Sequence, residues 1–352
     1  METEKSVAPL PRDNYYFLGH DDAEQLFLNA WRNDSLHNSW LISGIKGVGK
    51  ATLAYRLARF ILSNVGKDKT NCSSLDVSPD APVAKQMSSG SHPDFKVLER
   101  DYTDTERKKI LKAIKDGEQL SSAELKDMKK SAFIRVDDVR NINEFLSKRS
   151  SQDGWRIVLV DSVDDMNTAS ANAILKILEE PPHKTLMLLI SHNPGRLLPT
   201  IRSRCAKLEL KPLSEGCVAS LLRRYRPELS EAEIKKVASI SSGSIGKALN
   251  YVDNQAVRRY DSLCKIVSSG KNFKTADVLE FCADAVVNED SYYLTQELLL
   301  KFLSELIKSS DNPVAICATW ENAFKTFYEA EGLNMDKRQA LMNIIVDICK
   351  QF

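Results

Sequence analysis

The sequence has 352 residues, and its 49 Lys and Arg almost balance its 48 Asp and Glu, giving a formal net charge of +1. This balance excludes a bulk electrostatic attraction to nucleic acid or membrane, so such contacts are expected to be local or made through partners. A polar amino-terminal lead and the lack of any apolar run near the roughly 18 residues of a membrane span predict a cytoplasmic protein without a signal peptide. Seven scattered cysteines, an odd number, favour reduced thiols.

The first expected element is an amphipathic helix around residues 23–31, which precedes an apolar strand. His20 and His37 flank this helix. Because lone histidines in such positions are more often hydrogen-bonded loop residues than ligands, we expect both to be loop residues.

Residues 39–62, SWLISGIKGVGKATLAYRLARFIL, predict a strand, a phosphate-binding loop and a helix. Gly44, Gly47 and Gly49 allow successive backbone N–H groups to turn toward phosphate oxygens, at the positive end of the following helix. Lys50 adds a mobile cation for the outer phosphates. The alternative is a glycine-rich turn that binds nothing.

The residue after Lys50 departs from the phosphate-loop pattern. A Ser or Thr is expected there to hold Mg²⁺, but Ala51 occupies the position and the hydroxyl comes one residue later, on Thr52. A helix turns about 100° per residue, so Thr52 points elsewhere unless the loop slips. The sequence therefore supports Mg²⁺ only weakly.

The next part of the chain is mostly polar. Residues 66–92 predict a long loop, residues 92–100 a strand, and residues 101–131 an exposed helical insertion with a solvated face. The alternative for the insertion is a functional basic patch, although its acidic residues offset its lysines. A short strand and a helix are expected over residues 132–149.

A short apolar strand, Ile157 to Val160, ends in Asp161, where a nucleotide-binding sheet places a carboxylate that orients Mg²⁺. Hydrolysis also needs a carboxylate that positions water, usually in the next residue, but here that residue is Ser162. Asp164 or Asp165 is the alternative, displaced from the required geometry.

A helix over residues 172–180, ended by two prolines, and a buried strand over 185–190 follow. Glu179 and Glu180 oppose the dipole of that helix, which leaves two interpretations: a solvated helix end, or a contact with a partner or loop. The alternation of strands and helices after an early phosphate loop predicts an α/β fold with a doubly wound parallel sheet.

The order of GIKGVGK, VLVD, NAILKILEEPP and IRSRC resembles the clamp-loader AAA+ ATPases of bacterial DNA polymerase III, from about Gly19 to Gly246 and more weakly beyond. The resemblance implies an AAA+ fold and a place in a hetero-pentameric ring with gamma/tau and delta subunits in the bacterial cytoplasm. Through that complex the chain would act on a sliding clamp and primed DNA. No polymerase activity of its own is expected.

Ser203, Arg204 and Cys205 fall on the family's SRC motif, whose arginine reaches the ATP site of a neighbouring subunit as a trans-acting finger. A guanidinium fits this role because it is permanently charged and stabilises the charge of the transferring phosphate. Arg202 is an adjacent competitor, although Arg204 matches the motif. The remaining interpretation is a plain surface arginine.

Three positions that active relatives use are altered: Ala51, Ser162, and Gly246 where a sensor arginine is expected. We therefore expect a subunit that does not hydrolyse ATP efficiently. Its glycines and Lys50, with Thr52 and Asp161, still predict binding of ATP or ADP.

Two other functions would use the same phosphate loop. The chain is an ATPase motor of the gamma/tau type if Thr52 and Asp164 or Asp165 replace the lost groups, whereas a P-loop kinase would leave the SRC segment unexplained.

The family's zinc knuckle needs four cysteines after the phosphate-loop helix, and only Cys72 lies there, so no structural zinc is expected.

The predicted domains are a nucleotide-binding AAA+ domain over residues 1–211, a helical lid over 212–252 and a helical collar over 253–352. Ser214 and Ser230 are expected N-caps in the lid. Helix-period stripes in the collar indicate a core, and the resemblance implies that some face neighbouring subunits. The stripes include Leu294, Leu298, Phe302, Leu306, Leu341, Ile345 and Ile348.

Overall fold

The computed structural model describes residues 8–69, 72–116, 124, 128–148, 150, 154–310, 312–333 and 335–350. The chain forms two compact units. The first comprises Met1–Leu221 with Gly243–Gly246, and the second comprises Leu222–Ser242 with Lys247–Phe352. The expected domain boundaries at residues 211 and 252 stay a prediction.

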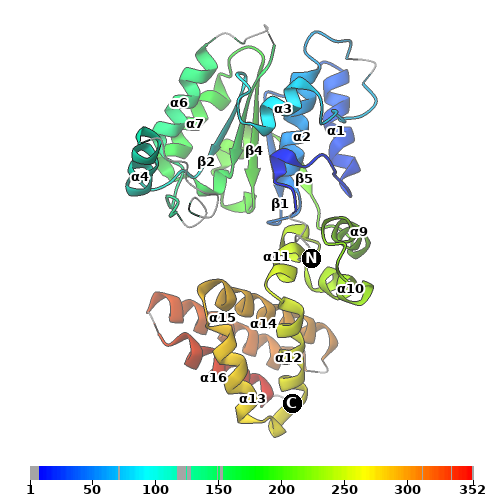
Figure 1. The fold of residues 1–352 in the computed structure, drawn as a ribbon, viewed down its shortest axis with the longest axis vertical. Coiled ribbons are helices and arrows are strands. Elements are labelled where there is room, and N and C mark those ends of the chain that lie inside the picture. Colours follow the sequence, from blue (N-terminus) through cyan, green and yellow to red (C-terminus); the bar gives the residue numbers. More distant parts are fainter. Residues whose placement is uncertain are drawn as a thin grey trace. The chain divides into compact units, whose positions relative to one another are not determined.

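A five-stranded parallel sheet in the order β2-β3-β4-β1-β5 forms the centre of the first unit (Figure 1). Its central strands are continuous apolar runs because helices cover both faces. The sheet confirms the predicted doubly wound α/β fold. The strands are β1 (Ser39–Gly44), β2 (Phe95–Glu99), β3 (Arg156–Asp161), β4 (Thr185–Ser191) and β5 (Ala206–Leu210).

Helices α6 (Val136–Ser147) and α7 (Thr168–Glu179) cover one face of the sheet, and α2 (Lys50–Ser63) packs on the other (Figure 1). Fully buried Ile142 and Ile174 bring α6 and α7 onto Val158 and Leu189. These contacts hold the carboxyl ends of β1, β3 and β4 at one edge. The remaining elements of this unit are η1 (Pro11–Asp13), α1 (Asp21–Arg32), α3 (Pro82–Ser88), α4 (Asp104–Lys115), η2 (Val163–Asp165), η3 (Pro194–Arg196) and α8 (Pro199–Ser203).

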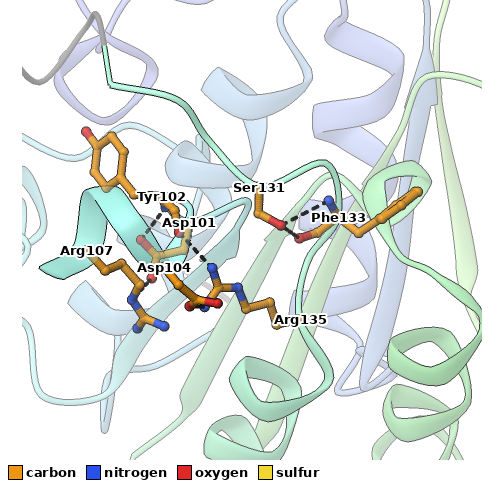
Figure 2. Close-up of polar contacts among 7 residues, drawn as sticks. All are labelled: Asp101, Tyr102, Asp104, Arg107, Ser131, Phe133 and Arg135. Carbon is orange, nitrogen blue, oxygen red and sulfur yellow. Dashed lines mark hydrogen bonds and ion pairs between the residues drawn. The ribbon is translucent and has the colours of Figure 1, made fainter.

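Helix α4 belongs to the predicted charged insertion, and polar contacts join the start of the insertion to the segment that precedes α6 (Figure 2). The backbone N–H of Ser131 donates to Asp101 O at 2.7 Å, which joins the two ends of the insertion. Arg135 Nη1 pairs with Asp104 Oδ1 at 2.6 Å, and its Nη2 donates to Tyr102 O at 2.9 Å. Residues 117–123 and 125–127 of the insertion lie outside the described residues.

The prediction of a short strand at the start of residues 132–149 is wrong. Ile134 makes only an isolated parallel bridge with Met166, and α6 begins at Val136. Ile134 is nevertheless fully buried, which explains why its apolar character resembled a strand.

The second unit is helical in the residues that the structure describes. Ser230 caps α10 (Glu231–Ile240) through a reciprocal capping box with Glu233, which confirms that predicted N-cap. Of the predicted stripes, Leu294, Leu298, Phe302, Leu341, Ile345 and Ile348 are buried, as expected for a core. Helix α11 (Ile245–Asp253) begins in the first unit and continues in the second. The other elements are α12 (Ala256–Ser268), η4 (Gly270–Asn272), α13 (Thr275–Ala285), α14 (Glu289–Ser309), α15 (Pro313–Gly332) and α16 (Lys337–Cys349).

Helix α9 (Glu215–Tyr225) begins in the first unit and ends in the second. Its first turn is capped by Ser214, whose Oγ accepts from Cys217 N at 3.2 Å, so this N-cap prediction is also confirmed. Within the described part of the chain, no helix combines the length and apolarity that crossing a membrane requires.

Candidate functional site

The predicted phosphate loop connects β1 to α2. Gly44, Gly47 and Gly49 have φ angles of +147°, +79° and +115°, a backbone region that residues with a Cβ rarely adopt. The loop therefore has the local geometry for which its glycines were singled out, and α2 begins immediately after it at Lys50. Backbone N–H groups at the start of α2 lie at the positive end of the helix, which suits phosphate.

The side chain of Lys50 is turned into this loop. Its Nζ donates to Gly44 O and Ile45 O, both at 2.7 Å, and the residue is only 3% exposed. Burial lowers the pKa of Lys50 to about 8, although the nearby Asp161 and Asp164 carboxylates raise it. Lys50 thus reaches an outer phosphate only by exchanging these two carbonyl oxygens for phosphate oxygens.

Asp161 ends β3 beside the loop and interacts with Lys50. Burial raises the pKa of Asp161, and the Glu99 carboxylate on the neighbouring strand raises it further, while Lys50 lowers it. The loop has the backbone geometry that suits a phosphate group, but the metal-binding set is incomplete because Ala51 has no side-chain oxygen and Thr52 is half-buried in α2. Binding of ATP or ADP, weak support for Mg²⁺ and the expected lack of zinc stay predictions.

The residues expected as substitutes for a water-positioning carboxylate have structural partners. Asp164 accepts hydrogen bonds from Ser191 Oγ at 3.0 Å and from the backbone N–H groups of His192 at 2.6 Å and Asn193 at 3.2 Å. Asp165 pairs with Arg100 at 3.3 Å. Asp164 therefore fixes the end of β4, a role that sequence reasoning missed because its donors lie 27–29 residues away.

The amino-terminal segment covers the phosphate loop. A Cβ added to Gly49 would lie 3.2 Å from the Phe17 ring, and His20 Nε2 contacts Val48 O at 3.2 Å. His20 is therefore a hydrogen-bonded residue, as expected, and burial lowers its pKa.

A second segment, Ser244 to Gly246, lies against the same loop. Ser244 Oγ donates to Lys46 O at 2.8 Å, and Gly246 N donates to Gly47 O at 2.9 Å. A Cβ on Gly246 would lie 2.7 Å from Gly47 Cα, closer than real Cβ contacts. Gly246 stands where the family resemblance implies a sensor arginine. Its lack of a side chain permits this close approach of the two backbones.

The SRC segment lies at the end of α8, whose last residue is Ser203. Arg204 is the C-cap of α8, its side chain is 36% exposed, and its Nη1 donates to Thr200 O at 3.1 Å. Its Nη2 pairs with Glu179 Oε1 at 2.8 Å. Ser203 Oγ also donates to Thr200 O, at 3.1 Å.

Cys205 and Arg202, the other candidate residues near Arg204 in the chain, differ from it in their surroundings. Cys205 is buried, and burial raises the pKa of its thiol to about 12. Arg202 is half-buried, and its Nε is buried without a hydrogen-bond partner in the described part of the chain. Arg204 therefore presents its guanidinium to solvent at the end of α8, whereas Lys50 and Asp161 interact electrostatically beside the phosphate loop.

The parallel sheet, the glycine loop and the helix that follows it define a P-loop protein of the α/β class. The family model described as "DNA polymerase III, delta subunit" matches residues 19–214, which is more than half of the chain. The chain belongs to this family.

Two curated relatives are DNA polymerase III delta' subunits. The protein of Pseudomonas aeruginosa is 32% identical over 209 residues, covering 59% of this chain and 53% of the relative. The protein of Escherichia coli strain K12 is 28% identical over 232 residues, covering 66% of this chain and 59% of the relative. The chain thus matches little more than half the length of these relatives.

Solved structures show weaker likeness. A gamma subunit-related protein of Thermotoga maritima is 18% identical with a TM-score of 0.39, covering 92% of this chain and 99% of that one. The T158V variant of Thermotoga maritima RuvB is 13% identical with a TM-score of 0.44, covering 96% and 91%.

Proposed function

We propose that the chain is a delta-prime-type subunit of the DNA polymerase III clamp loader. It works in a hetero-pentameric ring with gamma/tau and delta subunits, hydrolyses little or no ATP itself, and supplies Arg204 to the ATP site of a neighbouring subunit. The ring loads a sliding clamp on primed DNA. The family and the delta' relatives support the type of subunit.

The observation that carries the trans role is the placement of Arg204. Its guanidinium is partly exposed, is hydrogen-bonded to the backbone of α8, and belongs to a segment anchored by buried Ile201 and Cys205. A permanently charged planar group held on a rigid element is suited to stabilise developing charge on a phosphate of another subunit.

The expected lack of turnover in this chain rests on different residues. Ala51 provides no hydroxyl for a metal, Ser162 is 2% exposed where a carboxylate would position water, and Asp164 is engaged at the end of β4. The glycine loop and Lys50 retain the groups that would hold the phosphates of ATP or ADP. Nucleotide binding without efficient hydrolysis is consistent with this arrangement.

The test uses a loader reconstituted from all subunits, with this chain as wild type or Arg204→Ala. After equal assembly has been verified, ATP hydrolysis stimulated by clamp and primed DNA is measured. Loss of an arginine finger is expected to slow the dependent site by about 10³-fold. An unchanged rate at every site would refute the trans role, and turnover by the isolated chain that Lys50→Ala abolishes would favour a motor of the gamma/tau type.

A further inference from the structure

The carboxylate of Glu179 is the direct side-chain partner of Arg204. Glu179 is the last residue of α7, where the exposed carbonyl groups of the helix make a negative charge unfavourable. Its Oε1 lies 2.8 Å from Arg204 Nη2. The ion pair offsets this unfavourable position. Of the two interpretations of the helix end, a solvated end or a contact with a partner or loop, Glu179 makes a contact with the residue that follows α8.

Together with the backbone of α8, Glu179 fixes the orientation of the guanidinium. Nη1 donates to Thr200 O and Nη2 to Glu179, so two contacts on different sides determine the plane of the group. An arginine carries five N–H donors in a planar fork, and these two contacts leave donors for a phosphate. Without Glu179, the contact with Thr200 O is the one side-chain contact of Arg204 left among the described residues to restrain a long, flexible side chain.

A surface hollow lies next to this ion pair. Its volume is about 760 Å³, and it is lined by residues 35–39, by the end of α7 and by Arg204. Among the described residues that line the hollow, the acidic side chain is that of Glu179 and the guanidinium is that of Arg204. His37, which also lines it, directs Nδ1 back to the backbone of Ser39. The ion pair therefore supplies the charged groups of a hollow that is large enough to receive groups of a neighbouring subunit.

We propose that Glu179 is a positioning residue for Arg204, which it holds in the orientation that the ATP site of the neighbouring subunit requires. This inference rests on the proposed function of Arg204. Both side chains are partly exposed, at 36% and 47%, so the pair contributes little to the stability of the fold. Its loss should consequently affect turnover without unfolding the chain.

The experiment compares Glu179→Ala, Glu179→Gln and Arg204→Ala in the reconstituted loader. Glu180→Ala is the matched control, because Glu180 is an exposed neighbour at the same helix end and forms no ion pair among the described residues. Single-turnover hydrolysis at saturating ATP, clamp and primed DNA gives the rate of the dependent site. Thermal unfolding and gel filtration verify that every variant folds and assembles.

Glu179→Ala is expected to slow the dependent site about tenfold, since small misplacements of a reacting group are costly, with ATP affinity unchanged. Glu179→Gln should recover part of the loss, because its amide oxygen still accepts a hydrogen bond, although a weaker one than a carboxylate accepts. Glu180→Ala should match wild type. In an Arg204→Ala background, Glu179→Ala should have no further effect, because Glu179 acts only through Arg204.

The outcomes separate the two proposals. If Arg204→Ala slows the site but Glu179→Ala behaves like Glu180→Ala, the positioning role is wrong and the proposed function remains. The positioning role is also overturned if Glu179→Ala accelerates hydrolysis or adds to the effect of Arg204→Ala. If Arg204→Ala changes nothing, the proposed function fails and the positioning role fails with it.

Discussion

The contact between Gly246 and Gly47 makes a prediction whose sign opposes helix propensity. Gly246 is the second residue of α11, where replacing Gly by Ala normally stabilises a helix by about 1 kcal/mol. Here the added Cβ would lie 2.7 Å from Gly47 Cα and 3.4 Å from Gly47 O. Because backbone atoms approach from the other side, the segment or the loop must shift, and overpacking of this kind costs about 1–3 kcal/mol.

We therefore expect Gly246→Ala to lower the free energy of unfolding by about 2 kcal/mol, and the Tm by about 4–8 °C. The matched control is Gly216→Ala, at the second residue of α9, where the nearest atom to an added Cβ is Ser214 Oγ at 3.9 Å. Urea unfolding is followed by tryptophan fluorescence, to which buried Trp31 and Trp40 of the first unit contribute. A Gly246→Ala variant as stable as wild type, or stabilised like Gly216→Ala, would refute the close approach.

Two further predictions concern the edge of the sheet. Asp164→Ala should lower the free energy of unfolding by about 3 kcal/mol, because three donors lose their acceptor. Asp164→Asn should lower it by less, because the amide oxygen still accepts hydrogen bonds. No change in urea unfolding would show that Asp164 does not fix the end of β4. Burial lowers the pKa of Lys50 from 10.5 to about 8, so between these values the unfolded chain holds a proton that the folded chain releases, and stability rises with pH. Lys50→Met should flatten the stability profile across this window, whereas a profile parallel to wild type would contradict the burial of the ammonium group.

The local parts of the account could be predicted from the sequence. The strand, glycine loop and helix at residues 39–62 follow from patterns within a single stretch, and the apolar runs at β3 and β4 specify buried parallel strands. The Ser230 cap is likewise a short-range signal. Each of these elements depends on residues close to it in the sequence. Their alternating order along the chain was therefore enough to predict the α/β fold class.

Contacts between distant segments could not be predicted in this way. The approach of Gly246 to Gly47 joins segments about 200 residues apart, as does the Ser244 hydrogen bond, whose sequence separation is 198. Likewise, nothing near Asp164 in the chain indicates that its donors lie at the end of β4 and in the two residues after it. The sequence identified Glu179 as electrostatically unfavourable, but only the fold brings Arg204 to it.

The measurement that tests the central claim most directly is single-turnover ATP hydrolysis at each site of a reconstituted loader in which only this chain carries Arg204→Ala. The account predicts that one site, on a neighbouring subunit, slows by about 10³-fold while the others keep their rates. Unchanged hydrolysis at all sites, with assembly intact, would contradict the account.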